Sequence, residues 1–265
     1  MKRQLKRIKK RIILRCIGVV LIAVIGYSGY QLWSINQNYA QEAEMHSRML
    51  QYRPAAQATM QHVPISSTVH INPAEAVEPV LSQSIVDLQV SYPDVTGWLT
   101  VPGTQIDYPF VQGNDNEHYL HRDLDQNWSQ AGTIFMDYRN SNDFSDFNTI
   151  IFGHNMRNGS MFGTLKNFND QDFFDANKAG TIFLANETYE IEIMAFAVIK
   201  PDDAVIYNSN IITERDKVAF LDYVKSTARY YRDIGATAND RIVTLSTCNY
   251  EFDDARMVVI GRILM

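Results

Sequence analysis

The chain has 265 residues, of which 46% are hydrophobic, enough for one sizeable folded domain with extensions. Its formal net charge of −6 comes from 24 Lys and Arg against 30 Asp and Glu, yet eight of the basic residues fall within residues 1–15. Removing those eight leaves 16 basic residues against 30 acidic ones, and so acidic a body argues against a nucleic-acid partner, because phosphate binding needs a basic face.

A hydrophobic segment follows the basic N-terminus. Residues 12–30 form a stretch of 19 residues whose one charge, on Arg15, can snorkel. This is close to the ~20 residues that a helix needs to cross a bilayer, and Trp33 stands where an interfacial aromatic is expected. We therefore expect residues 1–11 to be a cytoplasmic basic head and 12–32 a transmembrane anchor, with the rest of the chain outside the cell. A cleaved signal peptide is the alternative.

Residues 33–74 are predicted to be an extracellular stalk and linker. They are polar and rich in Gln and Ala, and could be helical as far as Arg53, where Pro54 would stop the helix. The main folded domain is expected over 75–265. It opens with a short helix within 75–92, whose apolar residues recur at helical spacing: Val80, Leu81, Ile85, Leu88 and Val90.

From Val95 onward the pattern indicates strands and turns. The strand candidates are rich in Ile, Phe, Val and Thr and bounded by Gly or Asn: two within 96–113, then 131–138, 148–155, 180–186, 188–200, 241–248 and 256–265. Residues 160–178 suggest a helix or two short turns. The best helix is 213–231, with Thr213 as N-cap and an apolar side of Val218, Phe220, Leu221, Val224 and Ala228. About eight strands with one inserted helix predict a closed or nearly closed barrel.

The expected exported domain contains one cysteine, Cys248, because Cys16 lies in the hydrophobic segment. An unpaired exported thiol suggests a reactive role, although free cysteine is also a common buried residue. A cysteine nucleophile works as its thiolate, which a nearby base or cation favours. Acyl transfer also needs a group that stabilises the oxyanion of the tetrahedral intermediate.

Two residues could supply those functions. His154 comes directly after an apolar strand and is preceded by a glycine; taken alone, a solvated loop histidine is the simpler interpretation. Arg256 opens the last strand, so antiparallel pairing of 241–248 with 256–265 would place Cys248 and Arg256 at the same end of the sheet. Its alternative is a surface pair with Asp253 or Asp254. The sequence has no CxxC, HExxH, Gly-rich phosphate loop or GxSxG, so we expect no metal and no cofactor.

The motifs together are more specific than their parts. TLSTC at 244–248, Arg256 after it and GHNM at 153–156 resemble the sortase family. The segments 94–113, 131–140 and 148–165 are similar to its class B. The resemblance implies a mainly β fold with added helices: an eight-stranded sortase barrel with N-terminal helices and a long helix between strands 6 and 7, preceded by one transmembrane helix.

The resemblance also implies an activity. Such proteins are membrane-anchored cysteine transpeptidases on the outer face of Gram-positive bacteria. They cleave the C-terminal sorting signal of a surface protein, an NPQTN-like or related pentapeptide, hold the new end as a thioester, and pass it to an amine of a cell-wall precursor or to a pilin lysine. A mainly hydrolytic cysteine peptidase stays open as an alternative. A tethered binding module without turnover is disfavoured by the intact Cys248, His154 and Arg256.

Carried onto this sequence, the resemblance makes Cys248 the nucleophile, His154 the general acid and then base, and Arg256 the cation that stabilises the oxyanion. Ser246 lies two residues before Cys248 on an alternating strand and should face the same side. Further residues are expected to support or bind the substrate: Ser246, Thr247, Asn116, Leu120 and Tyr207.

Overall fold

The computed structural model describes residues 2–54, 83–248 and 255–264, with the backbone alone for residues 2–14 and 248. The chain divides into two compact units, Met1–Met45 and His46–Met265. The first unit belongs to helix α1 (Lys2–Met49). Within the described residues, one helix near the N-terminus is long and apolar enough to cross a membrane, by length and composition.

The second unit opens with the last turn of α1. A 3-10 turn, η1 (Leu50–Tyr52), follows and the helical segment stops before Pro54, as predicted. The His46 ring stacks on Tyr108 with centroids 4.3 Å apart, and Arg53 pairs with Asp107 at 2.8 Å. These contacts fasten residues 46–53 to the strand that begins at Asp107.

Helix α2 (Gln83–Ser91) falls within the region predicted to be helical. It buries Ile85 and Leu88 and contacts the first barrel strand. The predicted apolar face is wrong at Val90, whose side chain is 80% exposed. Val80 and Leu81 of that predicted face lie outside the described residues.

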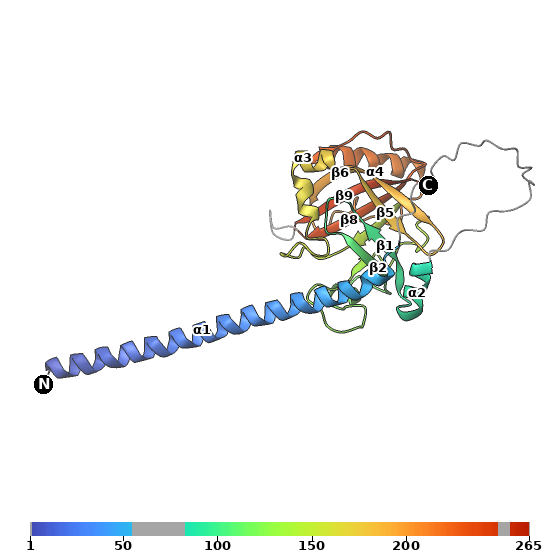
Figure 1. Ribbon diagram of the computed structural model, residues 1–265. Coiled ribbons are helices and arrows are strands. Elements are labelled where there is room, and N and C mark those ends of the chain that lie inside the picture. The colour runs from blue at the N-terminus through green and yellow to red at the C-terminus, as the bar shows by residue number, and fades with distance from the viewer. Residues whose placement is uncertain (1, 55–82, 249–254, 265) are drawn as a thin grey trace, which may run out of the picture. The chain divides into compact units, whose positions relative to one another are not determined.

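Eight strands close into a barrel, which confirms the predicted fold class. Their spatial order is β5-β1-β2-β3-β4-β8-β9-β6, and β5 pairs with β6 to complete the circle. The pairs β2/β3 and β4/β8 are parallel and the other six are antiparallel. Figure 1 shows these strands, whose bounds are β1 Val95–Thr100, β2 Asp107–Gln112, β3 Ile134–Met136, β4 Asn148–Phe152, β5 Ala179–Phe183, β6 Thr188–Ile199, β8 Arg241–Cys248 and β9 Arg256–Leu264.

Helix α4 (Glu214–Thr227) lies between the sixth and seventh barrel strands in chain order, as predicted. Its N-cap is Thr213, whose hydroxyl accepts a hydrogen bond from the Asp216 backbone N–H. Phe220 and Val224 of α4 pack in a buried cluster with barrel residues that include Ile242, Val258 and Ile260. Val258 and Ile260 alternate along β9, so one face of that strand packs in a core with this helix.

The structure ends α4 earlier than the sequence predicts. Residues Tyr230–Tyr231 form a short strand, β7, which pairs with Ala195 and Phe196 of β6 instead of continuing the helix. Val218, assigned to the apolar side of the helix, is 46% exposed. The segment 160–178 contains two short pieces, η3 (Leu165–Asn169) and α3 (Gln171–Ala176), and a further 3-10 turn, η2 (His118–Leu120), lies in the polar stretch before β3.

Candidate active site

Strand β8 is the centre of the candidate site, because its neighbours on either side carry the two predicted partners of Cys248. On one side, Cys248 is directly opposite Arg256 in the antiparallel pair β8/β9. On the other, the parallel pair β4/β8 sets Phe152 beside Ser246, and the Gly153 N–H donates to the Ser246 carbonyl at 3.2 Å. His154 follows Phe152 by two residues, as Cys248 follows Ser246. The predicted thiol, imidazole and guanidinium therefore come from the same end of three adjacent strands.

Gly153 fixes the way in which the chain leaves β4. A Cβ atom at this position would lie 2.8 Å from the ring of Phe162, which is fully buried. The Phe162 N–H in turn donates to the His154 carbonyl at 3.0 Å. Close packing of the backbone against this ring therefore requires glycine immediately before His154.

The imidazole of His154 is held by a backbone group. Its Nε2 lies 2.7 Å from the carbonyl oxygen of Leu120. A carbonyl oxygen accepts only, so Nε2 carries the hydrogen and Nδ1 is the nitrogen left for proton transfer. Burial lowers the pKa of His154; the hydrogen bond to Leu120 opposes this, and His121, stacked at a centroid distance of 5.6 Å, lowers the pKa further. The neutral imidazole is therefore favoured near pH 7.

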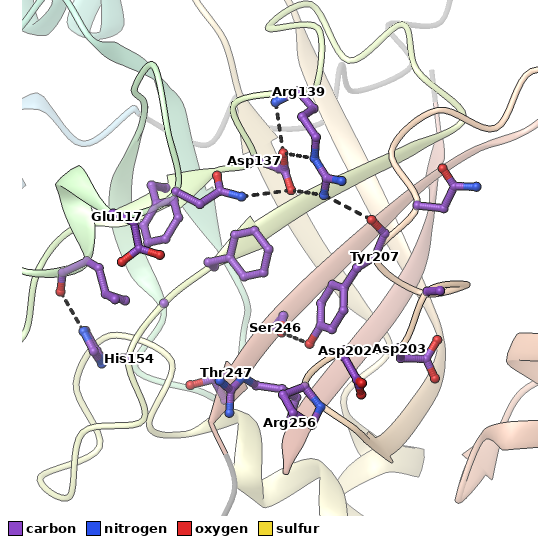
Figure 2. A pocket seen from close by; sticks show the side chains of 18 residues that line it. Glu117, Asp137, Arg139, His154, Asp202, Asp203, Tyr207, Ser246, Thr247 and Arg256 are labelled. Carbon is purple, nitrogen blue, oxygen red and sulfur yellow. Dashed lines mark hydrogen bonds and ion pairs between the residues drawn. The ribbon is translucent and has the colours of Figure 1, made fainter. Parts of the chain in front are cut away.

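One cavity of about 580 Å³ gathers almost all of the predicted residues. In Figure 2 His154 lies on one side, Tyr207 on the other, and Ser246, Thr247 and Arg256 between them. Seven of the eight predicted site residues line it: Asn116, Leu120, His154, Tyr207, Ser246, Thr247 and Arg256. For the eighth, Cys248, the backbone position at the end of β8 is described.

The predicted supporting residues make specific contacts. The Tyr207 hydroxyl and the Ser246 hydroxyl are 2.8 Å apart, and the Tyr207 ring packs against Phe152. Asn116 accepts from the Tyr138 N–H at 3.1 Å and donates to Asp137 at 3.2 Å. These bonds orient the side chains of Tyr207, Ser246 and Asn116, which reach the cavity from three separate segments of the chain.

Arg256 is half-buried, and its Nη1 donates to the Ala255 carbonyl at 3.3 Å. The alternative partners Asp253 and Asp254 lie outside the described residues. A guanidinium offers several donors in one plane, which suits an oxyanion.

Five charged residues of the cavity were not singled out from the sequence: Glu117, Asp137, Arg139, Asp202 and Asp203. Asp203 caps its own loop, since its carboxylate accepts from the Val205 and Ile206 N–H groups and from the Tyr223 hydroxyl. Asp137 is fully buried and paired with Arg139 at 2.6 Å. The signal for that pair was present in the sequence: an acid and a base two residues apart directly follow the apolar strand 134–136.

Comparisons with known proteins agree with this architecture. A family model of the sortase domain matches residues 99–264. The sortase B of Listeria monocytogenes is 41% identical over 181 residues, which cover 67% of this chain and 73% of that protein. A crystal structure of Clostridium perfringens sortase B has a TM-score of 0.65 at 36% identity, covering 68% of this chain and 99% of that one.

A crystal structure of Bacillus anthracis sortase B covers more of this chain, 86%, and 98% of its own, with a TM-score of 0.71 at 28% identity. The family match takes in strands β2 to β9 and both GHNM and TLSTC. The chain therefore belongs to the sortase family and, within it, to the class B sortases, which are cysteine transpeptidases.

Proposed function

We propose that this chain is a membrane-anchored transpeptidase in which Cys248 attacks the sorting signal of a surface protein, with His154 and Arg256 as its catalytic partners. The observation that carries the proposal is the register of three strands: Arg256 is directly opposite Cys248 on β9, and His154 leaves β4 beside the same end of β8. The proton carrier and the oxyanion-binding cation line one cavity together with Thr247, the residue before the nucleophile.

In the first half-reaction the Cys248 thiolate attacks the carbonyl carbon of the scissile peptide bond, and Arg256 stabilises the oxyanion that forms. Nδ1 of the His154 imidazolium gives its proton to the leaving amine as the C–N bond breaks. A thioester remains on Cys248. The lowered pKa of His154 makes the imidazolium the minor form at neutral pH, so the reactive thiolate–imidazolium pair is a small share of the molecules.

In the second half-reaction the amine of the acceptor attacks the thioester carbonyl. The neutral Nδ1 of His154 removes a proton from this amine, Arg256 again stabilises the oxyanion, and the C–S bond breaks to release the new amide and restore the thiolate. The acceptor is an amine of a cell-wall precursor, or a lysine if the substrate is a pilin. If water attacks instead, the product is the free acid.

The substrate is a C-terminal sorting pentapeptide of the NPQTN type. A cavity of about 580 Å³ is within the ordinary range for small ligands and suits a few residues of extended peptide. Asn116 and Leu120 would contact the peptide from one wall and Tyr207 from the other. Ser246 and Thr247 support the strand end that carries the nucleophile. A solved relative is described as a Staphylococcus aureus sortase B–substrate complex, which favours a peptide in the matching groove.

The proposal extends to the organisation of the whole chain. Residues 1–11 are a cytoplasmic head, 12–32 the transmembrane anchor, 33–74 the stalk and 75–265 the catalytic domain on the outer face. The long apolar helix of the first unit and the eight basic residues that precede or border it support this orientation.

The test uses the full chain in detergent micelles, incubated with an NPQTN-type peptide and a small primary amine. Mass spectrometry is expected to find a thioester on Cys248 and an amine adduct of the cleaved peptide, and Cys248→Ala is expected to form neither. Free acid without adduct would identify a hydrolase. Neither product with any sorting peptide would overturn the enzymatic proposal.

A further inference from the structure

An ion pair in the lining of the cavity, Asp137 with Arg139, has a fixed position in the barrel. Asp137 directly follows β3; its N–H donates to the Ile150 carbonyl at 2.9 Å and its carbonyl accepts from the Gln112 side chain at 3.0 Å. The neighbouring strands β4 and β2 thus hold its backbone from both sides. Its side chain is fully buried, whereas that of Arg139 is 44% exposed and lines the cavity.

Both carboxylate oxygens of Asp137 have two donors. Oδ1 accepts from the backbone N–H and the Nε of Arg139, each at 2.9 Å. Oδ2 accepts from Nη2 of Arg139 at 2.6 Å and from Nδ2 of Asn116 at 3.2 Å. Burial acts to raise the pKa of Asp137, but these bonds outweigh it and hold the pKa below its usual value. The carboxylate is therefore charged and the Arg139 fork is bidentate.

The pair reaches both walls of the cavity, as the dashed lines in Figure 2 show. Through Asn116 it holds the segment 116–120, whose Leu120 carbonyl accepts from His154. Through Nη2 of Arg139 it holds the carbonyl of Tyr207 at 3.1 Å, and the hydroxyl of the same Tyr207 meets Ser246. One ion pair fixed to the barrel thus joins two loops, those of Asn116 and Tyr207, which lie about ninety residues apart in the sequence.

Stability alone is a weak reason for such a pair. Removing the Asp137 carboxylate from water is costly, and apolar residues of similar volume are often as stabilising as an ion pair with a buried member. What an apolar pair lacks is directed bonds to Asn116 and to the Tyr207 carbonyl. We propose that Asp137 and Arg139 are positioning residues that set the width of the peptide groove by tying the Asn116 wall to the Tyr207 wall. This rests on the proposed function, in which the sorting peptide lies between these walls.

The variant Arg139→Lys tests whether the directed hydrogen bonds of Arg139, rather than its positive charge alone, are needed for this role. It retains the positive charge beside Asp137, but a single ammonium cannot reproduce both the bidentate fork and the bond to the Tyr207 carbonyl. Asp137→Asn keeps the shape and weakens the pair from the other end. Arg262→Lys is the matched control: Arg262 pairs with Glu192 at 2.5 Å on β9 and β6, and neither residue lines the cavity.

The experiment measures binding without turnover. Each variant is made in the full-length Cys248→Ala background, in detergent micelles, and the dissociation constant of a fluorescent NPQTN-type peptide is read by anisotropy alongside the thermal midpoint. We expect R139K and D137N to weaken peptide binding roughly ten- to hundred-fold, because the two walls of the groove would be misplaced. R262K is expected to leave binding unchanged. If the pair has only a structural role, the variants will have a lower thermal midpoint and a smaller fraction of folded protein. The molecules that remain folded will then bind the peptide with unchanged affinity.

Two results would overturn the inference and they are distinguishable. If the Cys248→Ala parent binds the peptide and R139K and D137N bind it equally well, the positioning role is wrong while the proposed function stands. If the parent binds no sorting peptide at all, the proposed function fails and the groove assignment fails with it. Should one of the two variants not fold, the other gives the answer.

Discussion

The imidazole Nε2 of His154 is hydrogen-bonded to the backbone carbonyl of Leu120 at 2.7 Å, so the tautomer of the proposed acid–base residue does not depend on any side chain. The Leu120 side chain can therefore contribute to the groove independently of this bond. The ring of His121 is stacked on the imidazole, with the two ring centroids 5.6 Å apart. The titration of His154 should consequently respond to a change of the His121 side chain, whereas a change of the Leu120 side chain leaves the hydrogen bond to its carbonyl in place.

His121→Asn is expected to raise the pKa of His154. Burial, the largest cause of the lowered pKa, remains in the variant, but the electrostatic effect of the His121 ring, which also lowers the pKa of His154, is gone. The imidazolium share at a given pH near neutrality therefore increases. The measurement is an NMR titration of the ring protons in the full chain, with the His154 signal assigned by its loss in His154→Gln.

The control for this titration is His118→Asn, because His118 faces Gln126 at 2.7 Å and the ring of Tyr119 rather than His154. It should leave the His154 titration where it was. A His154 pKa that stays constant or falls in His121→Asn would show that the stacked ring does not act on it electrostatically.

Tyr207→Phe and Ser246→Ala are expected to be coupled. Each change removes one side of the 2.8 Å hydroxyl pair, and a bond of this kind is worth about 1 kcal/mol of unfolding free energy. The double variant should therefore lose less than the sum of the two single losses, as measured by urea unfolding in a double-mutant cycle. Tyr223→Phe, whose hydroxyl donates to Asp203, should be additive with Ser246→Ala. Additive losses for Tyr207→Phe and Ser246→Ala would contradict the bond.

Asn148→Ala should destabilise both the barrel and the loop that carries Tyr207. The buried amide of Asn148 donates to the carbonyls of Ile206 and Asn208 at 3.0 Å each and accepts from the Thr244 hydroxyl at 2.9 Å. Its removal leaves several buried polar groups without this partner, which costs about 2–4 kcal/mol of unfolding free energy.

Urea unfolding measures this loss, and limited proteolysis reports cleavage within 200–213. The exposed Asn186 provides the control, since Asn186→Ala should change unfolding by less than about 0.5 kcal/mol. Equal stability of the two variants would mean that the loop is held by its other contacts.

Sequence patterns predicted the features that depend on interactions between residues close together in the chain. Pro54 stops a helix and Thr213 caps one because each acts within its own turn, and the alternation in 241–248 and 256–265 identified two neighbouring strands. The sequence could not indicate that Tyr230–Tyr231 would leave its helix, because pairing with β6 decides that. Likewise Val90 matches the helical spacing, but contacts with the barrel select another face of α2.

The residues of the candidate site also fall into two groups, those that sequence motifs indicate and those that only long-range contacts reveal. Cys248, His154 and Arg256 stand in short motifs at strand ends, and the resemblance of those motifs to the sortase family singled them out. The Asp137–Arg139 pair is significant through what it touches, and those partners, Asn116 and the Tyr207 carbonyl, lie 21 and 68 residues away. Sequence spacing carries no record of contacts at that separation in a barrel closed by pairing of non-consecutive strands.

Gly153→Ala should impair both folding and chemistry, and a second change should relieve the defect. The added methyl would lie 2.8 Å from the Phe162 ring, and overpacking of this kind costs about 1–3 kcal/mol. Because Gly153 also bonds to the Ser246 carbonyl, a shift of its backbone moves His154 relative to β8. Thioester formation should therefore slow by more than the loss of folded protein explains.

Phe162→Leu makes room for that methyl. Alone it leaves a cavity and destabilises the fold, but in the Gly153→Ala background it should restore part of the stability and part of the rate, so that the two changes are strongly non-additive. Gly235→Ala is not a suitable comparison because Gly235 has a positive φ of 67° and would be strained for that reason. Gly180→Ala is the better control, since its Cβ would first meet a backbone oxygen at 3.1 Å and Phe162→Leu should give it no relief. Equal rescue of both glycine variants would indicate a general softening of the barrel rather than a specific contact between Gly153 and Phe162.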